Sequence, residues 1–268
     1  PSPLCLKMKP ISPDQEAAAR DLELSYRLPE IVRQRLRTLE ALSLKSGEHA
    51  LDIGCGVGFL AHDMALQVGA SGRVLGIDQN PAMLRHTQQR CAELSQTEFR
   101  LGEASRLPVT DQTLDVVSCT QVLLYVPDLA QVLAEIHRVL KPGGRVALVE
   151  TDWRCVVLGS ADDVLTRRIF AAWDATVANP NLPVHLIPLL KAQGFSDIRT
   201  VAIPIINTDY DPGGFAYDII QGFAETARQN SAINETEARL WLDDLQQRSQ
   251  SGSFFFCVNR FLFSAFRR

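Results

Sequence analysis

The sequence lacks the features that would place it in a membrane or in a disulfide-bonded scaffold. Its 268 residues contain no run of 18 or more apolar residues, and its first residues hold no apolar core of the kind found in signal peptides. The six cysteines are scattered, with no Cys-x-x-Cys pair that would suggest zinc or a redox couple. We therefore expect a soluble protein of the reduced cytoplasm, without a membrane partner and without a metal.

Positive charge is also scarce. Lys and Arg together number 27 against 31 for Asp and Glu, so the formal net charge is −4. Binding to nucleic acid needs clustered Lys and Arg for the phosphates, so a nucleic-acid partner is not expected. With 46% hydrophobic residues the chain is able to bury a full core. We expect a monomer or homodimer that acts on a small molecule.

A further absence lies in the stretch around which the chain is organised, ALDIGCGVGFL at residues 50–60. Its apolar start predicts a buried strand, its glycines a tight turn, and the apolar spacing that follows a helix. Backbone N–H groups gathered at such a turn form the outline of a nucleotide-cofactor site. A dinucleotide fingerprint would need a third glycine at position 59, which is Phe59. This mismatch argues against a nucleotide-dependent oxidoreductase, which we keep as an alternative.

Several ordered motifs instead match one family. The pattern Asp52-x-Gly-x-Gly-x-Gly is followed by RVLGIDQNPAML and later by LKPGGRVALVE. Together they resemble the class I S-adenosylmethionine (SAM)-dependent methyltransferases, in the small-molecule branch that includes the quinone and sterol methyltransferases. The resemblance covers about residues 30–153. It implies a SAM-dependent enzyme with S-adenosylhomocysteine as product. A SAM-binding enzyme that catalyses a rearrangement without methyl transfer is a second alternative.

Apolar runs and helical patterns alternate from residue 48 onward, which predicts a parallel sheet with crossover helices. The predicted strands are 48–53, 73–78, 97–101, 114–119, 145–150, 198–206 and a last one within 253–266. We therefore predict an α/β fold: a Rossmann-like, doubly wound, seven-stranded sheet with a helical cap. The resemblance implies the strand order 3-2-1-4-5-7-6 with strand 7 antiparallel.

The chain is expected to divide into three parts. Residues 1–47 form an N-terminal helical cap segment. Residues 48–206 and 253–268 form the SAM-binding domain. Residues 207–252 form a helical insertion over the acceptor site. In the last strand Phe254, Phe256, Val258 and Leu262 share one face and Phe255, Cys257, Phe261 and Phe263 the other, and burial of both faces is expected.

Two residues of the N-terminal segment are cofactor candidates. Arg35 shares a helical stripe with Ile31 and Leu39, so it is expected to face inward, where it needs an anionic partner. That partner is either a carboxylate of the fold or the carboxylate of the cofactor. Tyr26, just before this helix, is either a packed aromatic or a lid over the cofactor.

The glycine turn and the second strand supply the main cofactor candidates. Asp78, at the end of the second strand, is suited to accept two ribose hydroxyls, although a helix-capping role is an alternative. Asp52 would orient the turn, where Gly54, Gly56 and Gly58 let the backbone approach the ligand. The resemblance extends the set beyond the turn. The further members are Gln79, Met83 on the adenine, and Glu103 and Ala104 at the adenine edge. Thr120 and Gln121 end the fourth strand at the mouth of the sheet, where Gln121 would lie beside the methyl group or the methionine carbons. Cys55 is included as a small filler of the turn, and Glu103 stands where family members more often carry Asp.

The acceptor pocket is less legible. Tyr125 and Trp153 follow the fourth and fifth predicted strands and are candidates for its walls. His185 is the one histidine in a region where this fold places its acceptor pocket, which makes it the candidate base. No residue in the sequence is identifiable as orienting this imidazole, so catalysis by positioning alone is favoured.

Overall fold

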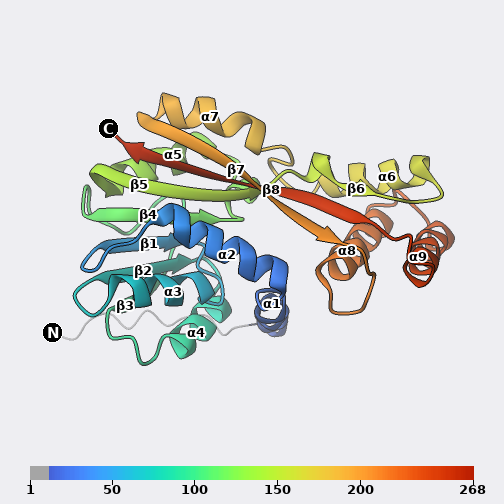
Figure 1. The fold of residues 1–268 in the computed structure, drawn as a ribbon, viewed down its shortest axis with the longest axis horizontal. Coiled ribbons are helices and arrows are strands. Elements are labelled where there is room, and N and C mark those ends of the chain that lie inside the picture. Colours follow the sequence, from blue (N-terminus) through green and yellow to red (C-terminus); the bar gives the residue numbers. More distant parts are fainter. Residues whose placement is uncertain (1–11) are drawn as a thin grey trace.

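A computed structural model describes residues 12–268 as one twisted sheet with helices on both faces and a helical lobe at one end (Figure 1). The strands are β1 (His49–Ile53), β2 (Arg73–Asp78), β3 (Thr97–Leu101), β4 (Leu114–Thr120), β5 (Leu140–Thr151), β6 (Val157–Leu158), β7 (Phe195–Asn207) and β8 (Phe256–Arg267). Residues 1–11 of the predicted N-terminal cap segment lie outside the described residues.

The sheet follows the predicted topology. Its order is β3-β2-β1-β4-β5-β8-β6, with β7 paired to β8. The first five strands pair in parallel, and β8 runs antiparallel to both β5 and β7. Because β7 and β8 correspond to the sixth and seventh predicted strands, the order 3-2-1-4-5-7-6 is confirmed. The two-residue β6, which pairs with β8 at Cys257, was not predicted.

Some strand ends differ from the prediction. β5 begins at Leu140, because that residue pairs with Leu114 before the turn at Gly143. β8 begins at Phe256, and of the two faces expected to be buried only one is fully so. Phe256 is completely buried, whereas Phe255 on the other side is 41% exposed because it precedes the paired region.

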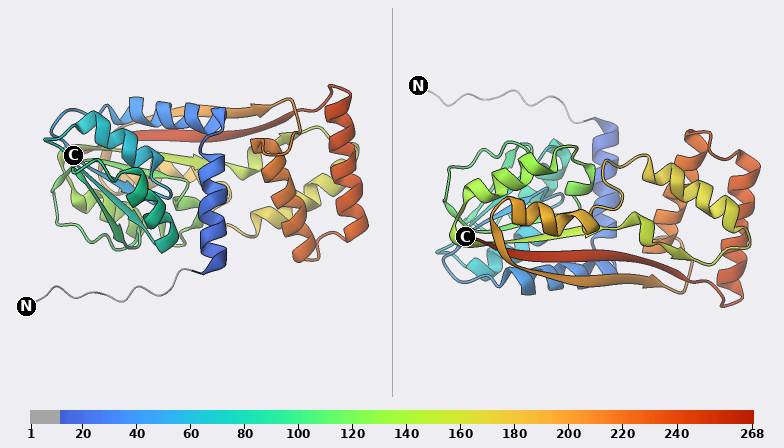
Figure 2. Two further views of the ribbon diagram at one scale, coloured as in Figure 1. Left: turned by 90° about the horizontal axis from the view of Figure 1, so that it is seen from below. Right: turned by 90° about the horizontal axis from the view of Figure 1, so that it is seen from above.

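The described helices are α1 (Pro13–Ser25), α2 (Pro29–Leu42), α3 (Phe59–Val68), α4 (Pro81–Arg90), α5 (Leu129–Val139), α6 (Asp163–Asp174), α7 (Pro183–Ala192), α8 (Phe215–Gln229) and α9 (Glu235–Gln250), with 3-10 turns η1 (Leu123–Tyr125) and η2 (Trp153–Cys155). Pro29 and Pro81 occupy first-turn positions, as predicted. Helices α2, α3 and α4 pack on one face of the sheet, and α5 and α7 on the other (Figures 1 and 2).

The helical lobe lies beyond the carboxyl ends of the parallel strands, and the long strands β7 and β8 run into it (Figure 1). It contains α8 and α9 from the predicted insertion. It also contains α6, which packs against both of them but falls in the segment that the sequence assigned to the SAM-binding domain. An amphipathic helix shows which of its faces is apolar, not which neighbour covers that face. Helix α1 stands between the sheet and the lobe (Figure 2).

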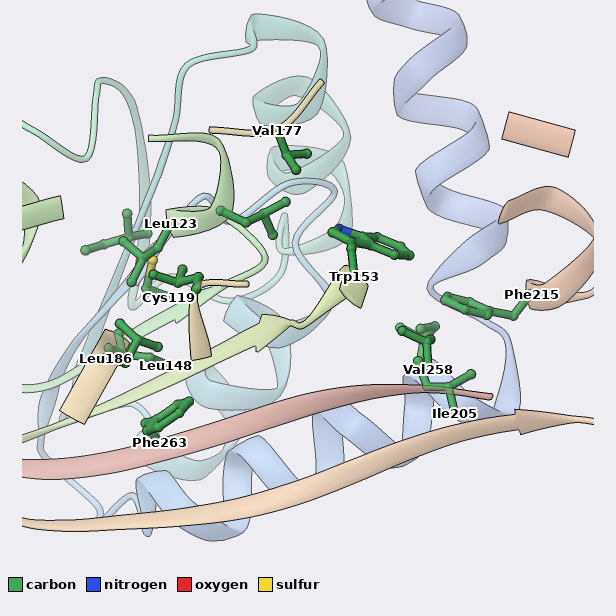
Figure 3. Packing of buried hydrophobic residues seen from close by; sticks show 14 of the residues in the cluster. Cys119, Leu123, Leu148, Trp153, Val177, Leu186, Ile205, Phe215, Val258 and Phe263 are labelled. Atoms are coloured by element: carbon green, nitrogen blue, oxygen red, sulfur yellow. The ribbon is translucent and has the colours of Figure 1, made fainter. Parts of the chain in front are cut away.

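Two apolar layers hold the sheet between its helices. One joins α2 and α3 to the sheet and includes Leu39, Met64 and Val149. The other lies under α5 and α7 and continues along the carboxyl ends of the strands into the lobe, where Trp153 and Phe215 belong to it (Figure 3). This continuity fixes the lobe against the edge of the sheet where ligands of open α/β sheets bind.

Candidate functional site: the carboxyl edge of the sheet

The glycine turn has the predicted strand–turn–helix geometry. Gly54, Gly56 and Gly58 all have positive φ, at 68°, 53° and 85°. At Gly58, which caps α3, an added Cβ would lie 2.6 Å from Thr87 Cγ2, so a larger residue would need the α4 helix to move. The N–H of Gly54 donates to the carbonyl of Ile77 at 2.7 Å, which holds the turn against the end of β2.

Asp78 ties this turn to the next helix. Its Oδ2 accepts from the Gly56 N–H at 2.9 Å and its Oδ1 from the Asn80 N–H at 2.8 Å. Each carboxylate oxygen has a second lone pair, so Asp78 keeps the capacity to accept two hydroxyl hydrogen bonds. Burial raises the pKa of Asp78. The N-cap of α4 is Asn80, whose side chain accepts from the Ala82 N–H, so the helix-capping alternative for Asp78 was wrong.

Asp52 is buried at the end of β1. Its Oδ1 accepts from the Ser118 hydroxyl at 2.6 Å. Burial raises the pKa of Asp52 to about 7, and the negative charge of Asp78 adds to the rise. Asp52, which is buried, and Asp78, which is half-buried, form no ion pair within residues 12–268, and such carboxyls favour a positively charged ligand beside them.

A pocket opens between this turn and the N-terminal helices. Its lining residues are Tyr26, Ile31, Gln34, Arg35, Thr38, Asp52, Gly54, Cys55, Leu60 and Thr120. Six of them are sequence-predicted cofactor residues. The hydroxyl of Thr120 is buried and has no hydrogen-bond partner among residues 12–268. The unpaired hydroxyl of Thr120, the guanidinium of Arg35 and the carboxyl of Asp52 around one pocket fit the polar amino-acid end of SAM.

Arg35 has an internal partner. Its Nε donates to Asp63 Oδ2 at 2.8 Å and its Nη1 to the carbonyl of Tyr26 at 3.2 Å. The structural ion pair that the sequence left open is thus present. A guanidinium carries five N–H groups, so donors remain on the pocket side.

Helix α1 covers the glycine turn. The side chain of Leu22 lies 3.1 Å from where a Cβ on Gly56 would stand. Both carboxylate oxygens of Glu23 accept from Arg90 Nη2 at 2.6 Å, which fastens α1 to the end of α4. The ring of Tyr26 stacks on Phe59 with centroids 5.9 Å apart, so it serves the packing role while closing one side of the pocket.

Four other predicted cofactor residues lie on the β2 and β3 side of the turn. Met83 packs under α1 beside Leu22. The Gly102 N–H donates to the Asp78 carbonyl, which brings the loop of Glu103 and Ala104 next to the end of β2. Gln79 and Glu103 are exposed, and Ala104 is half-buried. These four residues do not line the pocket beside Asp52, and their place near an adenine stays a prediction.

Gln121 lies where β4 and β5 end. It has a positive φ of 57°, its Nε2 donates to the Val149 carbonyl at 3.1 Å, and its Oε1 accepts from the Thr151 hydroxyl at 2.5 Å. The side-chain amide is therefore held in one orientation. Tyr125 follows on η1 and is 58% exposed.

Trp153 and His185 differ in their surroundings. Trp153 is buried, packs edge-on against Trp173 and Phe223 at centroid distances of 5.3 and 5.8 Å, and its indole N–H has no partner in the described chain. His185 is exposed in the first turn of α7, and its imidazole makes no hydrogen bond within residues 12–268. The structure thus buries Trp153 at the junction of sheet and lobe and leaves the imidazole of His185 exposed.

Sequence reasoning missed Ser118 and Arg260. Ser118 gives no signal of its own within an apolar strand. Arg260 is the single charge inside the aromatic run FFFCVNRFLF, and a charge in a strand expected to be buried on both faces is a detectable anomaly. Among the described residues no cluster of three His, Cys, Asp or Glu side chains is arranged to hold a metal ion, and no helix is long and apolar enough to span a bilayer.

The fold and this edge define a Rossmann-like domain with a site for a nucleotide-type cofactor. The chain belongs to the family described as "Methyltransferase domain", which it matches over residues 44–187. The predicted family resemblance is confirmed at this level, and the match favours a methyltransferase over an oxidoreductase.

Individual relatives agree with the family. The chain is 35% identical over 228 residues to an uncharacterized 37.1 kDa protein in transposon TN4556 of Streptomyces fradiae, covering 84% of this chain and 64% of that protein. It is 44% identical over 120 residues to the demethylmenaquinone methyltransferase of Lactobacillus johnsonii, covering 44% of this chain and 49% of the enzyme. The chain thus spans between about half and two thirds of the length of these two relatives.

Solved structures share the fold. The phosphoethanolamine N-methyltransferase 2 of Haemonchus contortus, in complex with SAM, superposes with a TM-score of 0.61 at 18% identity, over 94% of this chain and 57% of that one. At this identity the similarity concerns the fold.

Proposed function

We propose that this chain is a SAM-dependent methyltransferase that transfers a methyl group to a small, partly apolar organic acceptor. The observation that carries the proposal is the hydrogen bond from the Gly56 N–H to Asp78, which joins the glycine turn to the carboxylate at the end of β2. Membership of the methyltransferase family and the solved SAM complex of a structural relative support it.

Each part of the cofactor has suitable residues at this edge. Asp78 would accept the ribose hydroxyls, and the loop of Glu103 and Ala104 with Met83 would border the adenine. The turn at Gly54 and the guanidinium of Arg35 would face the amino-acid end. Thr120 and Gln121 lie nearest to the carboxyl ends of β4 and β5, where we place the methyl group. S-adenosylhomocysteine is the product.

SAM supplies a methyl group on a positively charged sulfur, so an acceptor carbon, oxygen or nitrogen displaces it directly and no covalent protein nucleophile is needed. The chain's contribution is to hold the acceptor in line and to exclude water. Orientation of this kind is able to supply about 7–11 kcal/mol. The covering helix α1, the fixed amide of Gln121 and the aromatic wall at Trp153 are suited to that work.

The position of His185 supports positioning rather than base catalysis. A base must lie within hydrogen-bond reach of the proton it removes, and it is usually oriented by a partner. His185 is exposed and its ring has no partner in the described chain.

Two measurements test the proposal and separate it from a non-methylating reaction. Calorimetric titration with S-adenosylhomocysteine, beside NAD⁺ as a control, should give binding of the former alone. Incubation with SAM that carries a labelled methyl group and a panel of small acceptors should then give a labelled product. A rearrangement enzyme would bind the cofactor without transferring label, and NAD⁺ binding would favour the oxidoreductase alternative.

We also infer the arrangement around the site. We propose that three parts of the chain enclose the acceptor: the N-terminal segment 1–47, the insertion 207–252, and α6, which packs on the helices of that insertion. A small-molecule acceptor, no nucleic-acid partner, a cytoplasmic location and a monomer or homodimer fit the acidic composition. Fluorescence anisotropy with labelled DNA and RNA, together with sedimentation analysis of the chain, tests the partners and the assembly.

A further inference from the structure

Arg260 is a buried cation that forms no ion pair within residues 12–268. It lies in the middle of β8, opposite Thr151 of β5 and Ile203 of β7, and is only 9% exposed. Its Nη1 donates to the side-chain carbonyl of Gln34, while its Nε is buried with no hydrogen-bond partner among residues 12–268. An isolated buried charge is costly, so its retention in a strand of apolar residues calls for an anion.

Glu150, the nearest carboxyl, is engaged elsewhere. Its two oxygens accept from the N–H groups of Val122, Leu123 and Leu124 at 2.9–3.3 Å. Burial raises the pKa of Glu150 to about 8, whereas the three N–H donors and the charge of Arg260 act in the opposite direction. Burial lowers the pKa of Arg260 to about 10, which leaves the guanidinium charged. The Glu150 oxygens are thus occupied by backbone N–H groups, and Glu150 makes no direct ion pair with Arg260 within the described chain.

Arg260 lies at the junction of sheet and lobe. Its guanidinium carbon stands 5.4 Å from the ring centroid of Phe215, the first residue of α8. On the adjacent strand β5, Thr151 pairs with Arg260 and donates its hydroxyl to Gln121. Gln121 lies where we place the methyl group. Figure 3 shows Phe215 and Trp153 approaching this end of β8 from different elements.

We propose that Arg260 binds an anionic group, a carboxylate or a phosphate, of the methyl acceptor. This inference rests on the proposed methyltransferase function and narrows its substrate class to small acids with an apolar body. A guanidinium pairs with either anion through two parallel hydrogen bonds, and the Nε with no partner supplies one of them. Aromatic side chains such as Phe215 and Trp153 provide the apolar surroundings.

The test compares anionic and neutral probes on the chain saturated with S-adenosylhomocysteine. Benzoate, cinnamate and phenyl phosphate are titrated beside benzamide, cinnamide and benzyl alcohol. The wild-type chain should prefer at least one anion over its neutral counterpart by about tenfold or more, since a hydrogen bond to a charged group contributes roughly that ratio. Which anions bind distinguishes a carboxylate from a phosphate. No preference in the wild-type chain would overturn the proposal.

Variants test whether the preference for anionic probes is due to Arg260. Arg260→Met should abolish it, whereas Arg199→Met, the same change at an exposed position of β7, should leave it intact. Arg260→Met should also leave the apparent melting temperature unchanged or higher, because an unpaired buried charge is removed. A preference that survives in Arg260→Met would contradict the proposal.

The cofactor's own carboxylate is the competing anion. If Arg260 bound that carboxylate, Arg260→Met would weaken the binding of S-adenosylhomocysteine but not that of 5′-methylthioadenosine, which lacks the amino-acid part. The proposal would then be wrong. We expect equal affinities of wild type and variant for both compounds. Absence of S-adenosylhomocysteine binding in the wild-type chain would instead overturn the proposed function.

Discussion

Protonation of Asp52 should control the affinity for SAM. The carboxyl is 2% exposed and accepts a hydrogen bond from Ser118, and burial raises its pKa to about 7. SAM is positively charged at its sulfur and its amino group, so it should bind best when Asp52 is ionised. With a pKa of about 7, roughly 3% of Asp52 is ionised at pH 5.5 and about three quarters at pH 7.5. Affinity should therefore rise about 25-fold over this range.

Calorimetry at pH 5.5, 6.5 and 7.5 and constant ionic strength measures this rise. The range ends at 7.5 because an α-amino group itself titrates at about 7.7–8.0. Asp52→Asn keeps an acceptor for Ser118 and should give weak binding that does not change with pH. Asp115→Asn, at the other end of the sheet, should keep the wild-type profile, since Asp115 pairs with Lys141. Affinity that is constant from pH 5.5 to 7.5 in the wild-type chain would refute the reasoning.

The same group has an effect on stability with a definite sign. A carboxyl whose pKa is raised in the folded state binds more protons than in the unfolded state between its ordinary pKa and about 7. The free energy of unfolding of the ligand-free chain therefore falls as pH rises through that window. Asp52→Asn should raise the apparent melting temperature at pH 8 and change it little at pH 4. A lower melting temperature at pH 8 would contradict the assigned shift.

Two further variants test the covering helix and the candidate base. Glu23→Gln removes the anchor of α1 on Arg90 and should speed release of S-adenosylhomocysteine about two- to fivefold in stopped-flow measurements, in keeping with a partly buried ion pair. Glu40→Gln, which breaks an exposed pair within α2, should not change the rate; an equal effect of both would mean that α1 does not retain the ligand. His185→Ala should lower turnover by less than about threefold, because an essential base would cost roughly 10²–10⁴-fold. A loss in that larger range, with the acidic limb of the pH profile gone, would restore His185 as the base.

Much of the fold could be predicted from the sequence because local residue patterns determine it. The first, second and fourth strands are short, largely apolar runs, and the bounds of the first four strands were predicted to within a residue. Pro29 with the stripe of Ile31 and Leu39 located the buried face of α2, and all three expectations agree with the structure. The turn that ends at Gly58 was also predictable, because positive φ at every second residue favours glycine at each of those positions.

The remaining features depend on contacts between distant segments. The two residues of β6 are too few to show a period, and they are defined by pairing with Cys257. Neither the packing of α6 into the lobe nor the ion pair of Glu23 with Arg90 leaves a local trace. The sequence shows Arg260 as an isolated charge in an aromatic strand. That its Nε has no partner among the described residues became clear only from the positions of Gln34 and Glu150 in the structure.

The most direct test of the central claim is the affinity of Asp78→Ala for SAM and S-adenosylhomocysteine. Both compounds carry the same ribose, so loss of the carboxylate should weaken both. A hydrogen bond to a charged group contributes about 1.5–3 kcal/mol, which predicts a loss of at least about tenfold by calorimetry on the folded variant. Because Asp78 also accepts from the Gly56 N–H, Asp78→Asn should preserve the glycine turn and lose less affinity than Asp78→Ala. An unchanged dissociation constant in a folded Asp78→Ala chain would remove Asp78 from the site and contradict the account.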